Sequence, residues 1–197
     1  MELLHQALNH DGCSHKKSKE LKTFINLELA DLHMIRGETN AALSHLSNSD
    51  VYIRDESFPP RLKAYGAYIS ARVGLRSNPF ELIKRYESLL VTLRNTPFKA
   101  LEIKILYHLG QENLCLGRSW TALSHFEKFL DLNKPPLLMY QGFTYGSMGA
   151  IFHTMGDLRK ARLFWEKAHA IFLDYFDSDH GLVLNVIEWI RRVDFEA

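Results

Sequence analysis

A helix–glycine–helix pattern recurs four times along this sequence of 197 residues and constrains its fold more than any other feature. In each block, apolar residues at helical spacing lead to a glycine, and a second helical stretch follows it. The glycines are 37, 43 and 39 residues apart, at Gly37, Gly74, Gly117 and Gly156. Glycine is favoured just past a helix end, because that position often takes a left-handed conformation that costs other residues free energy. No sustained two-residue alternation argues for strands, so the sequence predicts an all-α chain of antiparallel helix pairs.

Prolines and polar turn residues separate these blocks, as at Pro59-Pro60 and Pro135-Pro136. We expect a single domain over residues 1–197, because this length suits one continuous structure of four to five helix pairs. The predicted parts are a partial hairpin or N-terminal helix at residues 2–9, helix pairs at 20–56, 61–94, 98–132 and 137–176, and a C-terminal capping helix at 181–195.

The fourth block places small and aromatic residues at fixed spacing, and this pattern resembles the signature of the tetratricopeptide repeat family. The residues that carry it are Gly149, Phe152, Gly156, Ala161, Trp165 and Ala168. Gly149 is expected to let the two helices approach closely, with Ala161 fitting against the first helix and Trp165 filling the space between pairs. The third block repeats the pattern with Gly110, Gly117, Ala122 and Phe126, and the first with Ala30, Gly37, Ala42 and Leu46.

The second block departs from the family pattern, because Pro79 stands where a small packing residue is usual. The resemblance there rests on the phase of the repeat. Blocks of about 40 residues exceed the basic family period of about 34, so they look like the extended repeats of signalling regulators and adaptor proteins. The resemblance implies a right-handed superhelical solenoid of antiparallel helix hairpins.

In a tetratricopeptide stack the first helix of each pair lines a concave groove, so the resemblance implies which side chains point inward. The implied peptide-binding residues are Arg61, Tyr68, Arg72, Lys104, Tyr107, Gln111, Phe143 and His153. By the same repeat phase, the Asp31 side chain of the first pair is also expected to point into the groove. Because guanidinium and ammonium groups pair with carboxylates and tyrosines anchor contacts, we expect a protein or peptide partner that carries acidic residues. The predicted function is a binding scaffold that uses this groove.

Composition argues against other classes of partner. Lys and Arg number 24 and Asp and Glu 23, so the chain has no global positive field of the kind that drives direct nucleic-acid binding. No run of about 18 to 20 apolar residues predicts a membrane span, and the first residues do not form a secretory signal. We expect a cytoplasmic protein whose two scattered cysteines, Cys13 and Cys115, are reduced thiols.

No catalytic or cofactor motif stands out, so we expect neither enzyme activity nor a cofactor. His5, His10, Cys13 and His15 crowd the N-terminus, yet their spacing matches no familiar metal site. The glycine-containing run from Gln141 to Gly149 lacks the lysine and preceding strand of a phosphate loop.

Three alternatives stay open at this point. The first is a ligand-sensing or regulatory domain of a larger signalling or transcriptional regulator. The second, from another class, is a hydrolase or transferase whose site is not recognised. The third concerns the last helix: it can simply cap the stack, or its apolar surface around Trp189 can form a homodimer contact or the junction to a further domain.

Overall fold

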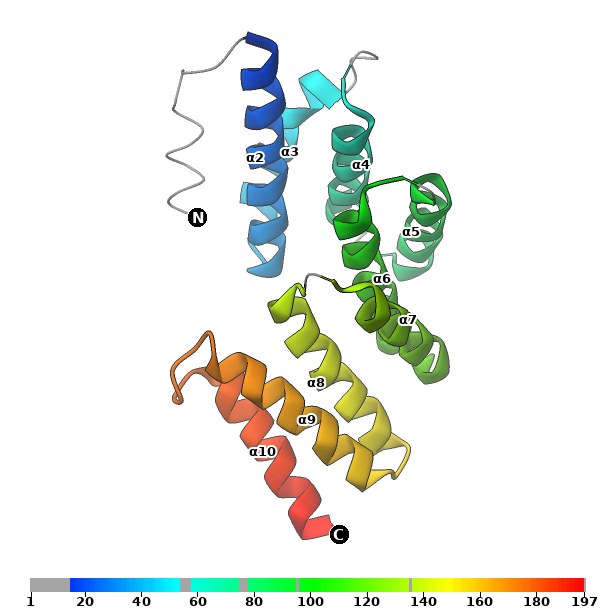
Figure 1. The fold of residues 1–197 in the computed structure, drawn as a ribbon, viewed down its shortest axis with the longest axis vertical. Helices are drawn as coiled ribbons and strands as arrows, with labels where there is room; N and C mark the ends of the chain where they lie inside the picture. The colour runs from blue at the N-terminus through cyan, green and yellow to red at the C-terminus, as the bar shows by residue number, and fades with distance from the viewer. Residues whose placement is uncertain (1–14, 54–57, 75–77, 95, 135, 197) are drawn as a thin grey trace. The chain divides into compact units, whose positions relative to one another are not determined.

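A computed structural model describes residues 15–53, 58–74, 78–94, 96–134 and 136–196 of the chain (Figure 1). Every regular element in these ranges is a helix, and the prediction of an all-α helical repeat is confirmed. The helices are α2 His15–Ile35, α3 Thr39–Ile53, α4 Pro60–Gly74, α5 Pro79–Leu93, α6 Lys99–Cys115, α7 Ser119–Leu132, α8 Leu138–Thr154, α9 Leu158–Leu173 and α10 Gly181–Glu196. The partial hairpin expected at residues 2–9 lies outside the described ranges.

The chain divides into two compact units, each described by itself below. The N-terminal unit, Met1–Phe98, contains the pairs α2/α3 and α4/α5, and the C-terminal unit, Lys99–Ala197, contains α6/α7, α8/α9 and α10. The expectation of one domain over the whole chain stays a prediction.

Three of the four expected glycine turns share one backbone geometry. Gly37, Gly117 and Gly156 have φ of 77°, 72° and 78°, in the left-handed region that favours glycine. After Gly156, the Asp157 N–H donates to the Phe152 carbonyl at 2.9 Å, and the Gly156 N–H donates to the His153 carbonyl at 3.0 Å. This pair of bonds is the Schellman motif, which satisfies the last carbonyls of a helix, and it recurs after Gly37 and Gly117.

The fourth turn differs. Gly74 is the last residue of α4 and does not take the left-handed conformation. The next helix begins instead with a side-chain cap: Asn78 Oδ1 accepts the Glu81 N–H at 3.2 Å, and Pro79 occupies the first turn of α5, where a missing N–H costs nothing. The second pair therefore has no left-handed glycine at the end of its first helix, and its second helix begins with an asparagine cap.

Small residues let the helices of each C-terminal pair lie close together. A Cβ atom on Gly149 would stand 2.4 Å from the Trp165 ring, and one on Gly110 would stand 2.3 Å from the Phe126 ring. Ala161 in α9 is fully buried. The close approach of the two helices expected at Gly149 is confirmed. Trp165 fills space within its own pair, against Gly149 of α8, and its ring also lies 5.7 Å from the Trp189 ring of α10. The contact of Ala161 with the first helix stays a prediction.

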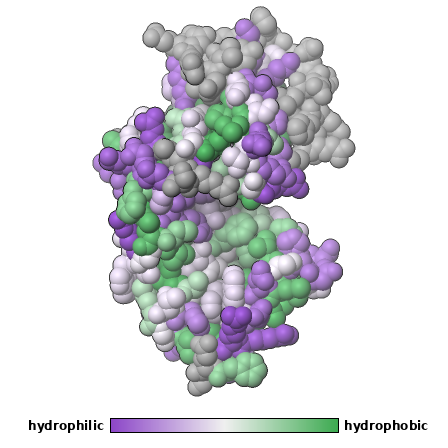
Figure 2. Space-filling view, turned by 180° about the vertical axis from the view of Figure 1, so that it is seen from behind, coloured by the Kyte–Doolittle hydropathy of each residue, from purple (hydrophilic) through white to green (hydrophobic). Residues whose placement is uncertain are grey.

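The last helix packs one face on α9. Val183, Val186 and Val193 are buried there. Arg162 on α9 ion-pairs with Glu166 and reaches across to Asp194 on α10, and these two carboxylates raise the pKa of its guanidinium above the ordinary value. Exposed apolar side chains occur on both units and include Leu43, Phe80, Trp120, Leu184 and Phe195. On the face in Figure 2, apolar areas alternate with polar ones. No helix in the described ranges is both long and apolar enough to cross a membrane.

Candidate functional site

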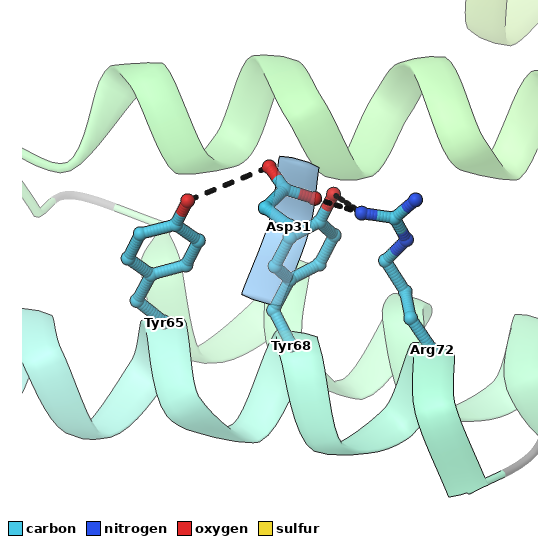
Figure 3. A network of polar contacts seen from close by, with 4 residues as sticks. All are labelled: Asp31, Tyr65, Tyr68 and Arg72. Atoms are coloured by element: carbon cyan, nitrogen blue, oxygen red, sulfur yellow. Dashed lines mark hydrogen bonds and ion pairs between the residues drawn. The ribbon is translucent and has the colours of Figure 1, made fainter. Parts of the chain in front are cut away.

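A buried polar network joins the first helices of the two N-terminal pairs (Figure 3). Asp31 of α2 and Arg72 of α4 form an ion pair in which Arg72 Nη1 donates to Asp31 Oδ1. The Tyr65 hydroxyl donates to Asp31 Oδ2 at 3.4 Å, and Arg72 Nη1 also donates to the Tyr68 hydroxyl at 3.3 Å. Asp31 is only 2% exposed and Arg72 8%. The two charges neutralise each other inside the unit.

This network involves two of the residues that the sequence assigned to peptide binding. Tyr68 is fully buried, and the guanidinium carbon of Arg72 lies 5.5 Å from the centre of its ring. The structure therefore places Tyr68 and Arg72 inside the N-terminal unit, where their polar groups have partners within the chain. Arg61, at the start of the same helix, is exposed.

Three more of the assigned residues share one side of α6 in the C-terminal unit. Lys104, Tyr107 and Gln111 recur at helical spacing, and all three side chains are half-buried. Gln111 Nε2 donates to Ser147 Oγ of α8 at 2.8 Å. The Tyr107 ring meets the Tyr140 ring of α8 edge to face, with centroids 4.9 Å apart. These five residues are called the α6–α8 face below.

The remaining two assigned residues sit on α8 and contact α9. The Phe143 ring lies 5.3 Å from the Phe172 ring, and the His153 ring lies 5.6 Å from the Trp165 ring. Between them, the Gly146 carbonyl accepts the Trp165 Nε1–H at 3.1 Å. No atom lies within 4 Å of where a Cβ on Gly146 would stand, so the helix has open space beside this residue.

Helix α8 carries neither a carboxylate nor a lysine or arginine from Leu138 to Thr154. Its polar groups are hydroxyls, one glutamine amide and the imidazole of His153. A surface of this kind can hydrogen-bond and stack against a partner without a large cost of desolvating charge. It can therefore contribute contact area, while Lys104 on α6 contributes positive charge.

Sequence reasoning missed Tyr140 and Ser147, which complete the α6–α8 face from the neighbouring pair. The signal was their spacing of seven residues, which puts both on one side of α8. It also missed the bond between Asp31 and Arg72. The sequence signal for this bond was stronger, because the repeat phase predicted that Asp31 and Arg72, of opposite charge, both point inward from consecutive repeats.

A surface cavity of about 480 Å³ lies at the turn between α9 and α10. Its lining includes three carboxylates, Asp174, Asp177 and Asp179, together with His180. The His180 ring stacks on Phe176 at 4.0 Å, and its Nδ1 accepts the Leu182 N–H at 3.2 Å. These contacts tie the imidazole to the turn itself.

In the N-terminal unit, the His33 and His45 rings stack with centroids 5.2 Å apart, and each imidazole has a further polar contact. The His33 imidazole lies 2.5 Å from a Glu38 carboxylate oxygen, and His45 Nδ1 lies 2.9 Å from Asn26 Oδ1. Within the described ranges, no three His, Cys, Asp or Glu side chains gather as a metal site would require. The side chains of the N-terminal group from His5 to His15 lie outside those that the structure describes.

Several solved structures resemble this chain in fold, among them the following three. BtubC (BKLC) from P. vanneervenii has a TM-score of 0.66 at 16% identity, over 98% of this chain and 78% of that one. A Podosopora anserina putative kinesin light chain with nearly identical TPR-like repeats has a TM-score of 0.58 at 15% identity, over 85% of this chain and 83% of that one.

The third is a Signal Transduction ATPase with Numerous Domains (STAND) from Pyrococcus horikoshii, which has a tetratricopeptide repeat sensor. Its TM-score is 0.53 at 18% identity, and the match covers 98% of this chain but only 28% of that one. No family model matches the sequence, and no curated protein matches it significantly. At identities below 20%, the likeness is one of fold.

Proposed function

The chain has the fold of tetratricopeptide-like repeat proteins, as the signature from Gly149 to Ala168 predicted, and from this we propose that it is a protein- or peptide-binding scaffold. A stack of helix pairs presents one side of each first helix to a ligand, and partners dock there through aromatic anchors and hydrogen bonds. No reaction is part of the proposal.

The observation that carries the proposal is the α6–α8 face. Tyr107 and Tyr140 supply half-exposed aromatic rings, the side-chain type most enriched at binding hot spots. The Gln111 amide and the Ser147 hydroxyl can each make a further bond to a peptide backbone, because neither group is saturated by their single mutual bond. Lys104, on the same side of α6, favours a partner with acidic residues.

The peptide-binding residues assigned from the sequence that lie outside the α6–α8 face have different roles in this proposal. Phe143 and His153 extend the binding surface along α8 towards the open space beside Gly146. Arg61 adds positive charge in the N-terminal unit. Tyr68 and Arg72 act from inside that unit and are not expected to touch the partner.

The test is capture of partners from a cell lysate by the immobilised full chain, with mass spectrometry of what is retained. We expect Lys104→Glu and Gln111→Ala to lower recovery of the main partner several-fold. Lys128→Glu on α7 is the matched control, because it reverses an exposed charge in the same unit away from this face. Equal recovery with the Lys104 and Lys128 variants, both folded by circular dichroism, would refute the α6–α8 face as the binding surface.

The second candidate is the ligand-sensing domain of a larger regulator. It is favoured by the Pyrococcus horikoshii protein, in which a chain of this fold corresponds to 28% of a longer signalling ATPase with a repeat sensor. Sequencing the gene beyond both ends of the chain tests it. An in-frame nucleotide-binding or DNA-binding domain would support this candidate, and stop codons on both sides would remove it.

A further inference from the structure

Two groups on α4, the Arg72 guanidinium and the Tyr65 hydroxyl, bond to a single carboxylate in the N-terminal unit, and Tyr68 contacts the arginine (Figure 3). We propose that Tyr65, Tyr68 and Arg72 of α4 form a carboxylate-binding site and that Asp31 of α2 is its built-in occupant. This inference does not depend on the proposed function.

The donors match the chemistry of a carboxylate. Each oxygen of Asp31 has its own donor, with Arg72 Nη1 on Oδ1 and the Tyr65 hydroxyl on Oδ2. The Tyr68 hydroxyl accepts from the same Arg72 nitrogen, and its ring lies beside the guanidinium. Tyr68 therefore orients the arginine, and the arginine and Tyr65 hold the ligand.

The receiving groups come entirely from the second helix pair. Residues 65, 68 and 72 recur at helical spacing and so share one side of α4. The Tyr65 and Tyr68 rings stack with centroids 5.9 Å apart, and Tyr68 also packs against Tyr86 of α5 at 6.0 Å. These contacts are made within the second pair. From the first pair, α2 supplies the carboxylate and also the Phe24 ring, whose centroid lies 6.3 Å from that of Tyr65.

Because Arg72 is buried, the fold requires a carboxylate beside its guanidinium. A buried arginine without a partner carries a large desolvation cost, which the carboxylate removes. Any external carboxylate must therefore compete with Asp31, and the wild-type chain does not offer Arg72 to an acidic partner. The inference predicts that a small carboxylate enters once the aspartate side chain is removed.

The experiment uses the full chain with Asp31→Ala. We expect this variant to unfold at a temperature about 10 °C lower than the wild type in sodium chloride, because it leaves a buried charge unpaired. Formate replaces the deleted carboxylate atom for atom, so sodium formate at equal ionic strength should restore part of the loss in a saturable way. Acetate, which is one methyl group larger, should restore less in a closed site.

Two controls separate binding from a general salt effect. The double variant Asp31→Ala/Arg72→Met should show no formate-specific recovery, because the receiving guanidinium is gone. Asp157→Ala removes a half-buried aspartate of the other unit and should also be insensitive to formate. Equal recovery in formate and chloride, or the same formate effect in the double variant, would overturn the proposal.

If Asp31→Ala does not fold, Asp31→Asn gives the decision. The asparagine keeps the shape but not the charge, so we expect a clearly lower unfolding temperature that formate does not change. A variant as stable as the wild type would show that α4 does not require a carboxylate, and the proposal would fail.

Discussion

At Gly149, a hydrogen in place of a side chain lets α8 lie directly against the Trp165 ring, which is only 4% exposed and has little room to move. Three residues earlier, Gly146 faces open space. Two glycines in one helix thus meet opposite surroundings, and the same substitution should have opposite effects at the two positions.

We predict that Gly149→Ala destabilises the protein by about 1–3 kcal/mol, because the added methyl group overpacks the contact with Trp165. Gly146→Ala should instead stabilise it by up to about 1 kcal/mol, because alanine is the better helix former and nothing obstructs its Cβ. Urea unfolding of both variants measures the difference. A Gly149→Ala variant as stable as Gly146→Ala would contradict the close packing of α8 and α9.

Helix α9 begins with a charged cap. Asp157 accepts the Lys160 backbone N–H at 3.0 Å, and this bond, assisted by the Lys160 side chain at 3.0 Å, lowers the pKa of the carboxyl below its ordinary value of 3.8. Because the folded-state pKa is the lower one, the ionised cap stabilises the fold at pH above the ordinary value. The stabilisation is lost as the pH falls through the lowered pKa.

The prediction concerns the gap in stability between the wild type and Asp157→Ala. It should be measurable at pH 7 by urea unfolding and should narrow as the pH falls below 3.8 and through the lowered pKa, where the aspartate becomes protonated. Asp157→Asn keeps a capping oxygen without a titrating group, so its stability relative to Asp157→Ala should stay nearly constant. A gap that widens in acid would contradict the charged cap.

Local rules explain why so much of the helical pattern could be predicted from the sequence. Helix periodicity and the left-handed turns at Gly37, Gly117 and Gly156 depend on residues within one or two turns of each other. The exception is Gly74, which does not take the left-handed conformation. That pair also lacked the family's small packing residue.

The candidate site could be predicted only in part, because side-chain partners are decided by residues far apart in the chain. The repeat phase selected Arg72 as an inward residue, but Asp31, 41 positions earlier, determines that it is buried in an ion pair. Likewise Tyr140 and Ser147 join Tyr107 and Gln111 only when α8 packs beside α6. The phase of the repeat predicts which way a side chain points. Whether that side chain is free to contact a partner depends on how the helices pack.

At the scale of the whole molecule, the C-terminal unit contains its own core. Two clusters of buried side chains, around Phe126 and around Trp165, draw all their members from Lys99–Ala197. Repeat stacks derive stability from each pair and its nearest neighbours, so a set of pairs with a core of its own can fold alone.

We therefore predict that the fragment of residues 99–197 is helical and unfolds cooperatively when expressed without the N-terminal unit. Circular dichroism during urea titration checks this, with the full chain as reference. The fragment should be less stable than the full chain. A gradual loss of helix without a transition would show that the C-terminal core depends on the missing half.

The placement of the tryptophans gives each unit a different optical signature. All three, Trp120, Trp165 and Trp189, belong to the C-terminal unit, and the rings of Trp165 and Trp189 lie 5.7 Å apart. Intrinsic fluorescence excited at the indole band therefore reports on that unit alone, whereas the far-ultraviolet helix signal sums both. One unlabelled sample followed by both signals shows whether the halves melt together: coincident curves mean one cooperative transition, and separated curves measure how weakly the halves are coupled.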